Sequence, residues 1–376
     1  MKKILITSTD SMMFLFLMPH VKNLIKKGYE VDIACSFLPE FSNQSYISKI
    51  KKTLPLGGTF HHVRLARSPF SFNNYYGYKD LVKILSTKKF DVLWCNEPVM
   101  GFISRLAGQK FRYSGLKTIY MAHGFHFFSE GPFLNYTLFP LEWFAARFTD
   151  VLCVINKMDF KFAKKMFKVD VHYINGIGFD ISRYSNAQIY RSDLRSKLLS
   201  NDKDFLLLSV GELNKNKNHA IVFKSLALLK EYKIRYIICG VGEQLKKLKS
   251  LAKCYGISDR VNFLGQRRDI YKLLGAADLF IHPSFREGLG VAPLEAMASG
   301  LAIVTSNRHG INDYSHSGIT GFSCSPNNAK CFADAIKYML LNPKKRKQMG
   351  EKNKIFVKKY DIKKLLIEIE DLIISV

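Results

Sequence analysis

Hydrophobic positions along this chain of 376 residues form short, nearly continuous apolar runs that alternate with longer amphipathic stretches. Continuous apolar runs are typical of strands buried on both faces, and the amphipathic stretches between them are typical of helices. The alternation therefore predicts parallel, doubly wound α/β sheets. The predicted strands of the first half are residues 3–9, 30–36, 60–65, 91–96, 117–123, 150–156 and 171–178. Those of the second half are residues 204–211, 235–242, 260–265, 278–284 and 301–307.

A polar stretch without strand character separates the two series of strands and predicts two domains. The length agrees, because domains usually contain roughly 100–200 residues. We expect a first Rossmann-like domain at residues 1–180, an interdomain segment at 181–203 and a second Rossmann-like domain at 204–360. The last residues, 361–376, have helical periodicity and are expected to cap one of the domains. Ligands of open parallel sheets bind beyond the carboxyl ends of the strands, so we expect a cleft between facing sheets.

The segment S-F-R-E-G-L-G-V-A-P-L-E-A-M-A-S-G, residues 284–300, follows a predicted strand and contains two glutamates. Its glycines predict a turn, and a helix follows with Pro293 in its first turn. The N–H groups of the turn and the helix start would form an anion site suited to a diphosphate. Glu287 and Glu295 could accept hydrogen bonds from sugar hydroxyls on either side of it. The alternative is a pair of surface glutamates at an ordinary loop–helix junction.

This segment resembles the E-x7-E signature of retaining glycosyltransferases of family 4, which have the two-Rossmann GT-B architecture. The likeness extends over nearly the whole chain. It implies that Glu295 binds the ribose hydroxyls of a nucleotide sugar. It also implies that Glu287 is a catalytic residue, with Lys217 and His123, and holds hydroxyls of the donor sugar near its reacting carbon. It also implies that the first domain binds the acceptor and the second the donor. The backbone that would surround the donor is that of Gly288, Leu289, Gly290 and Val291.

The loop V-G-E-L-N-K-N-K-N-H, residues 210–219, resembles the family's G-R-L-x-x-x-K loop, whose cations hold the leaving diphosphate. Gly211 and Lys217 match this pattern, and Glu212 stands where the arginine is expected. Lys215 or another cation would then replace the arginine, or the diphosphate is held with less charge. A departing diphosphate gains negative charge, so a fixed ammonium stabilises the transition state preferentially.

Other residues are assigned by the same resemblance. Gly242, in the strand-end turn C-G-V-G, is expected near the nucleotide, and Arg268 or its neighbour Arg267 is expected at the cleft. His123 ends a predicted strand and is expected to reach the donor sugar, although a histidine at a strand end is more often structural. The loop at 308–322 resembles a glycine-containing loop beside the donor.

The first strand is followed by polar residues where many relatives carry two glycines. Asp10 and Ser11 are expected to hydrogen-bond an acceptor sugar, with Asp10 as a base or positioning group. The motif D-K-D at 202–204 is interpreted as a solvated charge run. No cofactor and no essential metal are expected.

The chain carries 57 Lys and Arg against 31 Asp and Glu, a net charge of +26 that is spread over both halves. Nucleic acid, an anionic membrane or phosphorylated substrates would fit this charge, as would a lysine-rich composition without function. No nucleic-acid-binding signature is found, so nucleic acid is not expected as a partner.

Aromatic residues concentrate in two stretches, 69–80 and 131–148. The helical spacing of the second stretch predicts a helix that packs in the core. The alternative is a surface that rests on a bilayer, with Lys49, Lys51 and Lys52 near anionic lipids.

Seven cysteines without a C-x-x-C pair predict a reducing compartment and no disulfide framework. The N-terminal stretch reads as a strand and a helix rather than a secretory signal, and no apolar run reaches the length of about 18 residues needed to span a membrane.

The sequence thus predicts a retaining, metal-independent hexosyltransferase that uses a nucleotide sugar, with UDP as the expected nucleotide. Its expected acceptor is a polyprenyl-diphosphate-linked sugar or a glycan, in capsule, exopolysaccharide or O-antigen synthesis. We expect a cytoplasmic enzyme at the anionic inner face of the membrane. One alternative is a nucleotide-sugar 2-epimerase of the same fold, which would isomerise the donor without an acceptor. Another is a non-catalytic transferase-like subunit, which the joint presence of Lys217, Glu287 and Glu295 disfavours.

Overall fold

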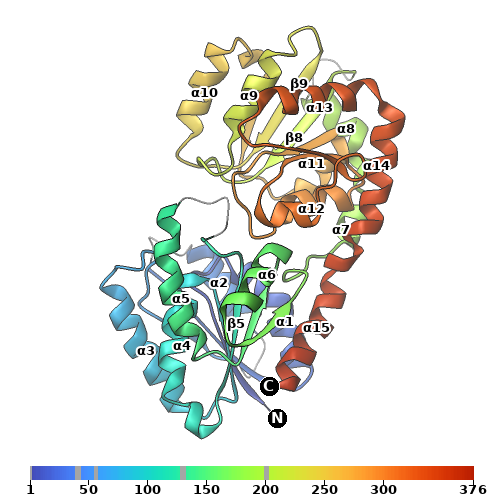
Figure 1. The fold of residues 1–376 in the computed structure, drawn as a ribbon. Coiled ribbons are helices and arrows are strands. Elements are labelled where there is room, and N and C mark those ends of the chain that lie inside the picture. Colours follow the sequence, from blue (N-terminus) through green and yellow to red (C-terminus); the bar gives the residue numbers. More distant parts are fainter. Residues whose placement is uncertain (1, 39–43, 55–57, 128–132, 199–202) are drawn as a thin grey trace. The chain divides into compact units, whose positions relative to one another are not determined.

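The computed structural model describes residues 2–38, 44–54, 58–127, 133–198 and 203–376. The chain divides into two compact units, the first made of residues 1–179 and 362–376 and the second of residues 180–361. Each unit contains one parallel sheet with helices packed against it (Figure 1). The expectations for Asp202 and for residues 131–132 lie outside the described residues.

The first unit is built on a seven-stranded sheet of order β3-β2-β1-β4-β5-β6-β7, in which neighbouring strands are parallel. Its strands are β1 (Lys3–Thr7), β2 (Glu30–Cys35), β3 (Phe60–His62), β4 (Val92–Asn96), β5 (Lys117–Ala122), β6 (Val151–Val154) and β7 (Asp170–Tyr173). Its helices are α1 (Phe14–Lys26), α2 (Gln44–Thr53), α3 (Asn73–Thr87), α4 (Pro98–Gln109), α5 (Phe139–Ala146), α6 (Lys157–Met166) and α15 (Ile362–Ser375).

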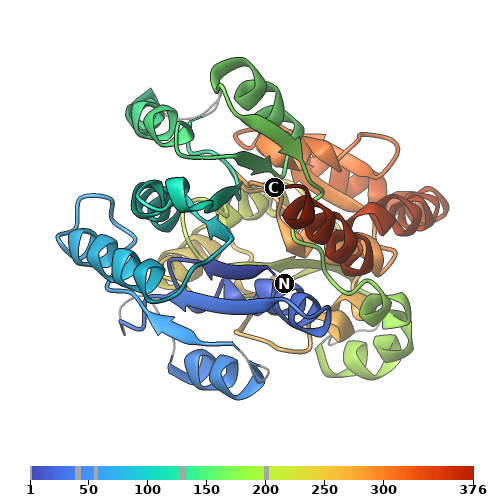
Figure 2. The same cartoon turned by 90° about the horizontal axis from the view of Figure 1, so that it is seen from below.

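Alternate residues of these strands supply cores on both faces of the sheet. Ile4 and Ile6 of β1 belong to the core that also contains apolar side chains of α1 and α15, whereas Leu5 belongs to the core under α3 and α4. The chain returns to this unit where the Ile362 N–H donates to the Phe179 carbonyl, 3.0 Å away, and α15 then packs against α1 (Figure 2). The C-terminal helix therefore covers the first unit.

The second unit is built on a six-stranded parallel sheet of order β10-β9-β8-β11-β12-β13. Its strands are β8 (Phe205–Val210), β9 (Ile234–Cys239), β10 (Val261–Gly265), β11 (Leu279–His282), β12 (Ile303–Ser306) and β13 (Gly321–Cys324). Its helices are α7 (Ser182–Ser185), α8 (Arg191–Leu198), α9 (His219–Ala227), α10 (Leu245–Cys254), α11 (Ile270–Ala276), α12 (Val291–Ala298), α13 (Ala329–Leu341) and α14 (Pro343–Phe356).

All the predicted strands correspond to β1 through β12, and β13 is the strand that the sequence pattern did not indicate. It is a short edge strand that begins with Gly321, so it lacks the long apolar run of a central strand. Residues 181–203, set apart above as an interdomain segment, belong to the second unit. Arg191 and Arg195 of α8 both pair with Asp278 at the start of β11, which ties this segment to the sheet.

The aromatic stretch around α5 does not form the core helix favoured by its spacing. In α5 the small Ala145 and Ala146 are buried, whereas the large Trp143 and Phe144 are about half exposed. Arg147 lies over the Trp143 ring at 4.4 Å. Spacing at intervals of three and four residues marks one face of a helix, but it does not say which face is covered. The alternative of an exposed aromatic surface therefore fits better.

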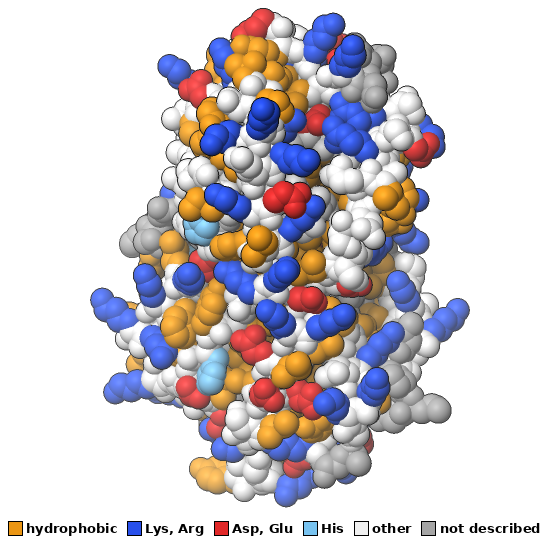
Figure 3. All heavy atoms as spheres, turned by 90° about the vertical axis from the view of Figure 1, so that its right-hand side faces the viewer, with side chains coloured by type: hydrophobic (Ala, Val, Ile, Leu, Met, Phe, Trp, Pro, Cys, Tyr) orange, Lys and Arg blue, Asp and Glu red, His pale blue; other side chains and the backbone are white. Residues whose placement is uncertain are grey.

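On the face drawn in Figure 3, blue Lys and Arg side chains are interspersed with acidic and apolar ones rather than gathered in one patch. Within the described residues, no helix is both long enough and apolar enough to cross a bilayer.

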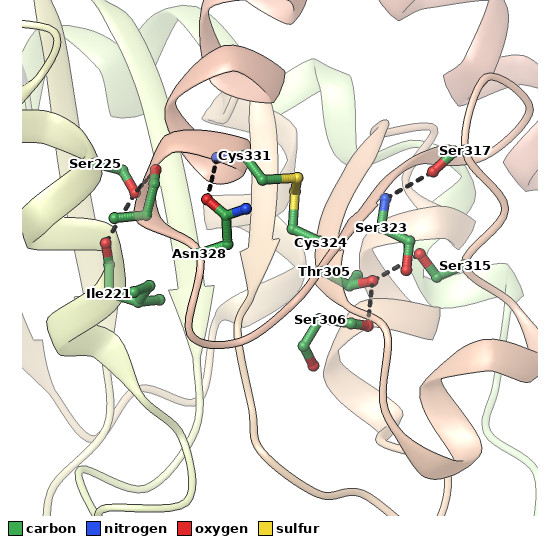
Figure 4. The surroundings of a disulfide bond; sticks show 11 residues. Ile221, Ser225, Thr305, Ser306, Ser315, Ser317, Ser323, Cys324, Asn328 and Cys331 are labelled. Carbon is green, nitrogen blue, oxygen red and sulfur yellow. Dashed lines mark hydrogen bonds between the residues drawn. A yellow bond between two sulfur atoms is a disulfide. The ribbon is translucent and has the colours of Figure 1, made fainter.

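The structure contains a disulfide between Cys324 and Cys331, which corrects the expectation that the cysteines form no disulfide (Figure 4). Cys324 ends β13 and Cys331 lies in the first turn of α13, with their Cα atoms 5.8 Å apart. The Asn328 side chain caps α13 by accepting a hydrogen bond from the Cys331 N–H, which turns the chain back towards the strand. A spacing of seven residues matches none of the usual motifs, so this pair could not be recognised from the sequence.

We predict that Cys331→Ser lowers the stability of the second unit by about 2.5 kcal/mol under oxidising conditions, because a bond across so short a loop restricts the unfolded chain only modestly. Denaturant unfolding with and without a thiol reductant would measure this. The reductant should lower the wild-type midpoint and leave the variant unchanged. An equal effect of reductant on both proteins would contradict the role of this bond.

Candidate active site

The central contact of the second unit joins two loops that lie 70 residues apart in the sequence. Lys217, which follows β8, places its Nζ atom 2.5 Å from Oε1 of Glu287, which follows β11. Strands β8 and β11 are parallel neighbours, so their carboxyl ends meet at the same edge of the sheet. The topology thus brings together two residues that the motifs indicated for binding the donor sugar and its leaving diphosphate.

Backbone and amide contacts fix these two loops against each other. The Phe285 N–H donates to the Asn216 carbonyl at 2.8 Å, and the Asn216 side-chain amide donates to the Arg286 carbonyl at 2.8 Å. Asn218 has a left-handed backbone, with φ of 52°, and its amide donates to the Pro283 carbonyl at 3.2 Å. Lys217 therefore lies between two residues that are themselves pinned to the partner loop.

Charge compensation keeps the Glu287 carboxylate ionised. Burial acts to raise the pKa of Glu287, but the Lys217 ammonium and a hydrogen bond from His282 outweigh it, so the pKa lies below its usual range. His282 is the last residue of β11, and its Nε2 atom lies 3.2 Å from the same carboxylate oxygen. Burial lowers the pKa of His282. A neutral imidazole with its proton on Nε2 would thus donate to an ionised carboxylate, which can accept hydrogen bonds from sugar hydroxyls.

A buried hydroxyl without a partner lies beside this cluster. Among the described residues, the Tyr314 hydroxyl is buried and has no hydrogen-bond partner. A Cβ atom built on Gly290 would lie 3.2 Å from this hydroxyl and 3.5 Å from His282 Nε2, so the two groups converge on the glycine. Buried polar groups are normally satisfied, and an exception needs an explanation. A polar ligand beside Gly290 would supply the missing partner.

Helix α12 begins directly after this glycine. Gly290 adopts φ of 85° as the N-cap, a left-handed conformation that favours glycine, and Val291 starts the helix. The first N–H groups of a helix lack intrahelical acceptors and point towards an anion at its start. Gly288 and Val291 are partly exposed and Leu289 is buried. These residues occupy the expected position for backbone donors to a diphosphate.

Glu295 lies in α12 and receives a hydrogen bond from the Tyr184 hydroxyl of α7. Burial raises the pKa of Glu295, although the Tyr184 hydrogen bond and the nearby Arg183 act in the opposite direction. Tyr184 is buried and α7 packs against α12, so the orientation of the carboxylate depends on the segment that precedes the second sheet. The two glutamates of the signature therefore differ in chemistry, because Glu287 is paired with a cation and Glu295 with a phenol.

Glycines allow a second loop to approach the Lys217 loop. The Gly211 N–H donates to the Cys239 carbonyl at 2.9 Å, and a Cβ atom at Gly240 would lie only 1.8 Å from the Gly211 carbonyl oxygen. At Gly242 a Cβ atom would lie 2.5 Å from the Leu213 carbonyl oxygen. Any larger residue would separate the loops, so both glycines have a structural role whether or not a nucleotide lies beside them.

The charged residues around this loop differ from the family pattern. Glu212 is exposed and accepts a hydrogen bond from the Asn214 amide at 3.0 Å. Lys215 is exposed as well. Arg267 pairs with Asp269, whereas Arg268 is exposed and its carbonyl accepts a hydrogen bond from Arg183. The structure therefore brings Lys217, Glu287 and the start of α12 together, and it leaves Glu212 and Arg268 on the surface.

In the first unit, polar groups gather at the carboxyl ends of β1 and β4. Glu97 Oε2 accepts hydrogen bonds from the Ser8 hydroxyl at 2.6 Å and from the Thr9 N–H at 2.7 Å. Asp10 accepts the Met12 N–H at 2.8 Å and pairs with Arg67. Asp10 and its neighbour Ser11 are both buried. The loop expected to bind the acceptor is therefore fixed by the buried contacts of its own side chains.

Glu97 has an unusual backbone for a non-glycine residue. Its φ of 64° and ψ of 158° lie in a region that is essentially restricted to glycine and costs about 1–3 kcal/mol. Burial raises the pKa of Glu97 and the neighbouring Asp10 raises it further, while the Ser8 and Thr9 hydrogen bonds oppose them. A strained residue that carries a partly buried carboxylate is the kind of feature that clusters at functional sites.

His123 follows β5 and lies next to the same cluster. Its Nε2 atom is 3.0 Å from Oδ1 of Asn96, whose amide donates to the Thr7 carbonyl at 3.1 Å. Because the Asn96 oxygen must accept, the His123 proton resides on Nε2 and Nδ1 carries a lone pair. Burial lowers the pKa of His123 to about 4, so the ring is neutral near pH 7. It can accept a hydrogen bond from a sugar hydroxyl.

Sequence reasoning missed four residues that the structure places at these sites: His282, Tyr314, Tyr184 and Glu97. His282 lies inside the predicted strand 278–284 and is the last residue of the observed β11, so its place near a strand end was a usable signal. Tyr314 lies inside the loop at 308–322 that the resemblance indicated, but no pattern distinguishes it there. Tyr184 and Glu97 act through contacts more than 80 residues away in the sequence, which spacing cannot reveal.

Within the part of the chain that the structure describes, no three His, Cys, Asp or Glu side chains are grouped as they would be around a metal ion. The polar groups around Glu287 and around Glu97 are carboxylates, amides, an ammonium and neutral imidazoles. Such groups can form hydrogen bonds with the hydroxyls and phosphates of a ligand.

Two family models match the chain, one for each sheet. The model described as Glycosyltransferase Family 4 matches residues 19–174, and the model described as Glycosyl transferases group 1 matches residues 191–356. The second match includes Lys217, Glu287 and Glu295.

Two curated relatives resemble the chain over most of its length. It is 31% identical over 360 residues to the putative glycosyltransferase EpsD of Bacillus subtilis, covering 94% of this chain and 91% of the relative. It is 29% identical over 266 residues to the UDP-Gal:alpha-D-GlcNAc-diphosphoundecaprenol alpha-1,3-galactosyltransferase of Escherichia coli, covering 68% of each.

A solved structure confirms the architecture. The crystal structure of Anabaena HepE in complex with UDP-glucose matches all of this chain and all of its own, with a TM-score of 0.80 at 20% identity. The predicted fold of two Rossmann-like parallel sheets is thereby confirmed. On the strength of the family matches and of the likeness to EpsD, the chain belongs to glycosyltransferase family 4, with the GT-B fold of that family.

Proposed function

We propose that this glycosyltransferase transfers a hexose, with retention, from a UDP-sugar to a sugar carried on a polyprenyl diphosphate. The product would be part of a capsule, exopolysaccharide or O-antigen. The observation that carries the proposal is the cluster of Lys217, Glu287 and His282 beside the unpartnered hydroxyl of Tyr314. The printed activity of the Escherichia coli relative, from UDP-galactose to a diphosphoundecaprenol-linked sugar, supports the choice of donor and acceptor.

At the donor end, Glu295 would bind the ribose hydroxyls and the amides between Gly288 and Val291 would bind the diphosphate. Glu287 would accept hydrogen bonds from hydroxyls of the transferred sugar. Lys217 would exchange part of its contact with Glu287 for a contact with the diphosphate. Since Lys215 is exposed and Glu212 carries the wrong charge, Lys217 and the helix amides would supply most of the stabilisation of the leaving group.

In the proposed reaction the bond from the anomeric carbon to the phosphate oxygen breaks while the acceptor oxygen bonds to the same carbon. Attack occurs on the face from which the diphosphate departs, and the proton of the acceptor hydroxyl passes to the departing phosphate oxygen. Negative charge grows on the diphosphate as the bond breaks, so Lys217 and the α12 amides stabilise the transition state more than the ground state. This course requires no metal and no cofactor.

At the acceptor end, Asp10 and Ser11 would hydrogen-bond the acceptor sugar. Neutral His123 would accept a hydrogen bond from a hydroxyl of the donor sugar through Nδ1. Glu97 would hold the Ser8 hydroxyl and the Thr9 N–H and thereby position Asp10.

We also propose a peripheral contact with the anionic inner face of the membrane, which would place the enzyme on the cytoplasmic side. The half-exposed Trp143 and Phe144 support that contact.

The direct test incubates purified protein with UDP-, GDP- and ADP-sugars, with and without a polyprenyl-diphosphate-linked sugar. We expect release of UDP that depends on the acceptor, with the anomeric configuration of the donor preserved. Isomerised donor in the absence of acceptor would favour an epimerase instead. Absence of turnover with every donor and acceptor would contradict the proposal.

Lys217 and Glu295 should affect different kinetic parameters. Lys217→Ala should lower kcat by about 10²–10³-fold, because it removes a group that acts on developing charge. Glu295→Ala should mainly weaken donor binding, measured by calorimetry with UDP.

Lys224→Ala, at an exposed position on α9, is the control and should retain full activity. Lys215→Ala tests whether that residue replaces the missing arginine; a loss of kcat equal to that of Lys217→Ala would contradict our assignment.

Tyr314→Phe separates a binding role from a structural one. The wild-type hydroxyl is buried without a partner, so its removal should leave the free protein as stable or up to about 1–3 kcal/mol more stable. Affinity for the UDP-sugar should fall about tenfold, because the ligand loses its hydrogen bond. Thermal unfolding with and without donor would measure both effects. Unchanged donor affinity would show that the hydroxyl does not contact the ligand.

Glu97→Gln should produce a pH-dependent gain in stability together with a loss of activity. Folding raises the pKa of Glu97, so its contribution to stability is present at low pH and is lost as pH rises through the folded-state pKa. The glutamine stays neutral and avoids that loss, while its oxygen can still accept the Ser8 and Thr9 hydrogen bonds. The variant should therefore exceed wild type in stability at pH 7.5 but not at pH 4. Its kcat/KM for the acceptor should fall about fivefold or more, since hydrogen bonds to an ionised group are stronger. A stability difference independent of pH would contradict this account.

A further inference from the structure

Two phenylalanines on the first unit are almost completely exposed. Phe70 and Phe72, in the loop that leads into α3, have 87% and 89% of their surface accessible. Tyr75 and Tyr76, in the first turn of α3, are about half exposed. Single exposed apolar residues are ordinary, but neighbouring large aromatic side chains on one element indicate a binding surface.

These side chains border an apolar groove on the first unit. The groove has a volume of about 510 Å³ and lies between the loop, α3 and α4. Its lining includes Pro69, Phe70, Phe72, Tyr75, Ile103 and Leu106. Its walls are mainly aromatic rings and aliphatic side chains, which suits a flexible hydrocarbon better than a polar ligand.

The loop that presents the phenylalanines is held in place. The buried Asn74 donates from its amide to the carbonyls of Ser68 and Pro69, at 2.8 and 3.2 Å, and its oxygen accepts the Ala66 N–H at 3.0 Å. A Cβ atom at Gly77 would lie 2.8 Å from the Arg64 carbonyl oxygen, so α3 also packs closely on the chain just before the loop. The exposure of Phe70 and Phe72 is therefore built into the fold.

An ion pair connects this loop to the proposed acceptor site. Arg67 pairs with Asp10, and Arg67 has a side chain that is 62% exposed. Consecutive Cα atoms are about 3.8 Å apart, so Phe70 lies within about 11 Å of Arg67. The groove consequently begins close to the residue that contacts Asp10.

Lysines lie over two of the aromatic rings that line the groove. Lys79 lies over the Tyr75 ring at 4.5 Å and Lys110 over the Tyr78 ring at 5.5 Å. An apolar groove edged by positive charges complements a ligand that has an anionic head and an apolar chain.

We propose that this groove binds the isoprene units nearest the diphosphate of the acceptor lipid, with Arg67 beside the diphosphate. The inference rests on the proposed function and adds the position of the lipid. The chain would pass from Asp10 over Phe70 and Phe72, and α3 and α4 would shield it from water. A simple bilayer contact would explain the exposed rings, but it would not need a groove that begins at the acceptor loop.

Binding of soluble prenyl diphosphates tests the proposal without any transfer step. Calorimetry would compare farnesyl diphosphate, dimethylallyl diphosphate and inorganic pyrophosphate as probes. Wild type should bind the farnesyl compound at least about tenfold more tightly than the dimethylallyl compound, because more hydrocarbon is buried. The double variant Phe70→Ser/Phe72→Ser should reduce this preference to less than about threefold. Arg67→Gln should weaken binding of all three probes by a similar factor.

Tyr113→Ser is the matched control, because it removes an equally exposed aromatic of the same unit outside the groove. It should retain the preference for the longer chain. The proposal is overturned if wild type binds all three probes equally, or if the double variant keeps the preference. It is also overturned if the double variant loses only flotation on vesicles that lack prenyl lipids, which would identify a bilayer contact. A preserved chain-length preference without sugar transfer would leave this inference standing and refute the proposed function alone.

Discussion

The ion pair between Lys217 and Glu287 is the contact on which the second unit's site depends. Each residue follows a central strand of a parallel sheet, and each compensates the charge of the other in a partly buried position. The pair also joins the loop after β8 to the turn before α12, where the first helix N–H groups lack intrahelical acceptors. Removing either partner would leave an uncompensated charge, so the geometry of the site and its electrostatics cannot be separated.

The two units position their carboxylates by different means. In the second unit a glycine, Gly290, adopts the left-handed turn that lets α12 begin beside Glu287. In the first unit Glu97 itself adopts a glycine-like conformation at the start of α4, and two hydrogen bonds from the loop after β1 hold it there. Glycine at this position would relieve strain but would remove the carboxylate. The presence of glutamate therefore indicates that the loop after β1 requires its side chain.

The sequence was informative where a feature is local. Continuous apolar runs identified the strands β1 to β12, and the motif around Glu287 and Glu295 identified the second site because strand, turn, helix and carboxylates are consecutive in the chain. It was uninformative where partners are distant. Nothing in the spacing joins Tyr184 to Glu295 or Glu97 to Ser8. The disulfide of Cys324 with Cys331 is local, but its spacing of seven residues matches no recognised motif. Periodicity likewise marks an aromatic face of α5 without saying whether Trp143 is covered.

The pairing in the free protein bears on how donor binding would favour reaction. In the proposed reaction the diphosphate competes with Glu287 for Lys217, while sugar hydroxyls compensate the carboxylate. Binding then exchanges one charge contact for another, and the gain in the ground state is small. As the glycosidic bond breaks, charge grows on the diphosphate and the exchange becomes increasingly favourable, which is the condition for lowering the barrier rather than merely tightening binding. The same argument accounts for Glu212: a second strong cation in this loop would strengthen the ground-state contact as well, so its absence need not abolish turnover.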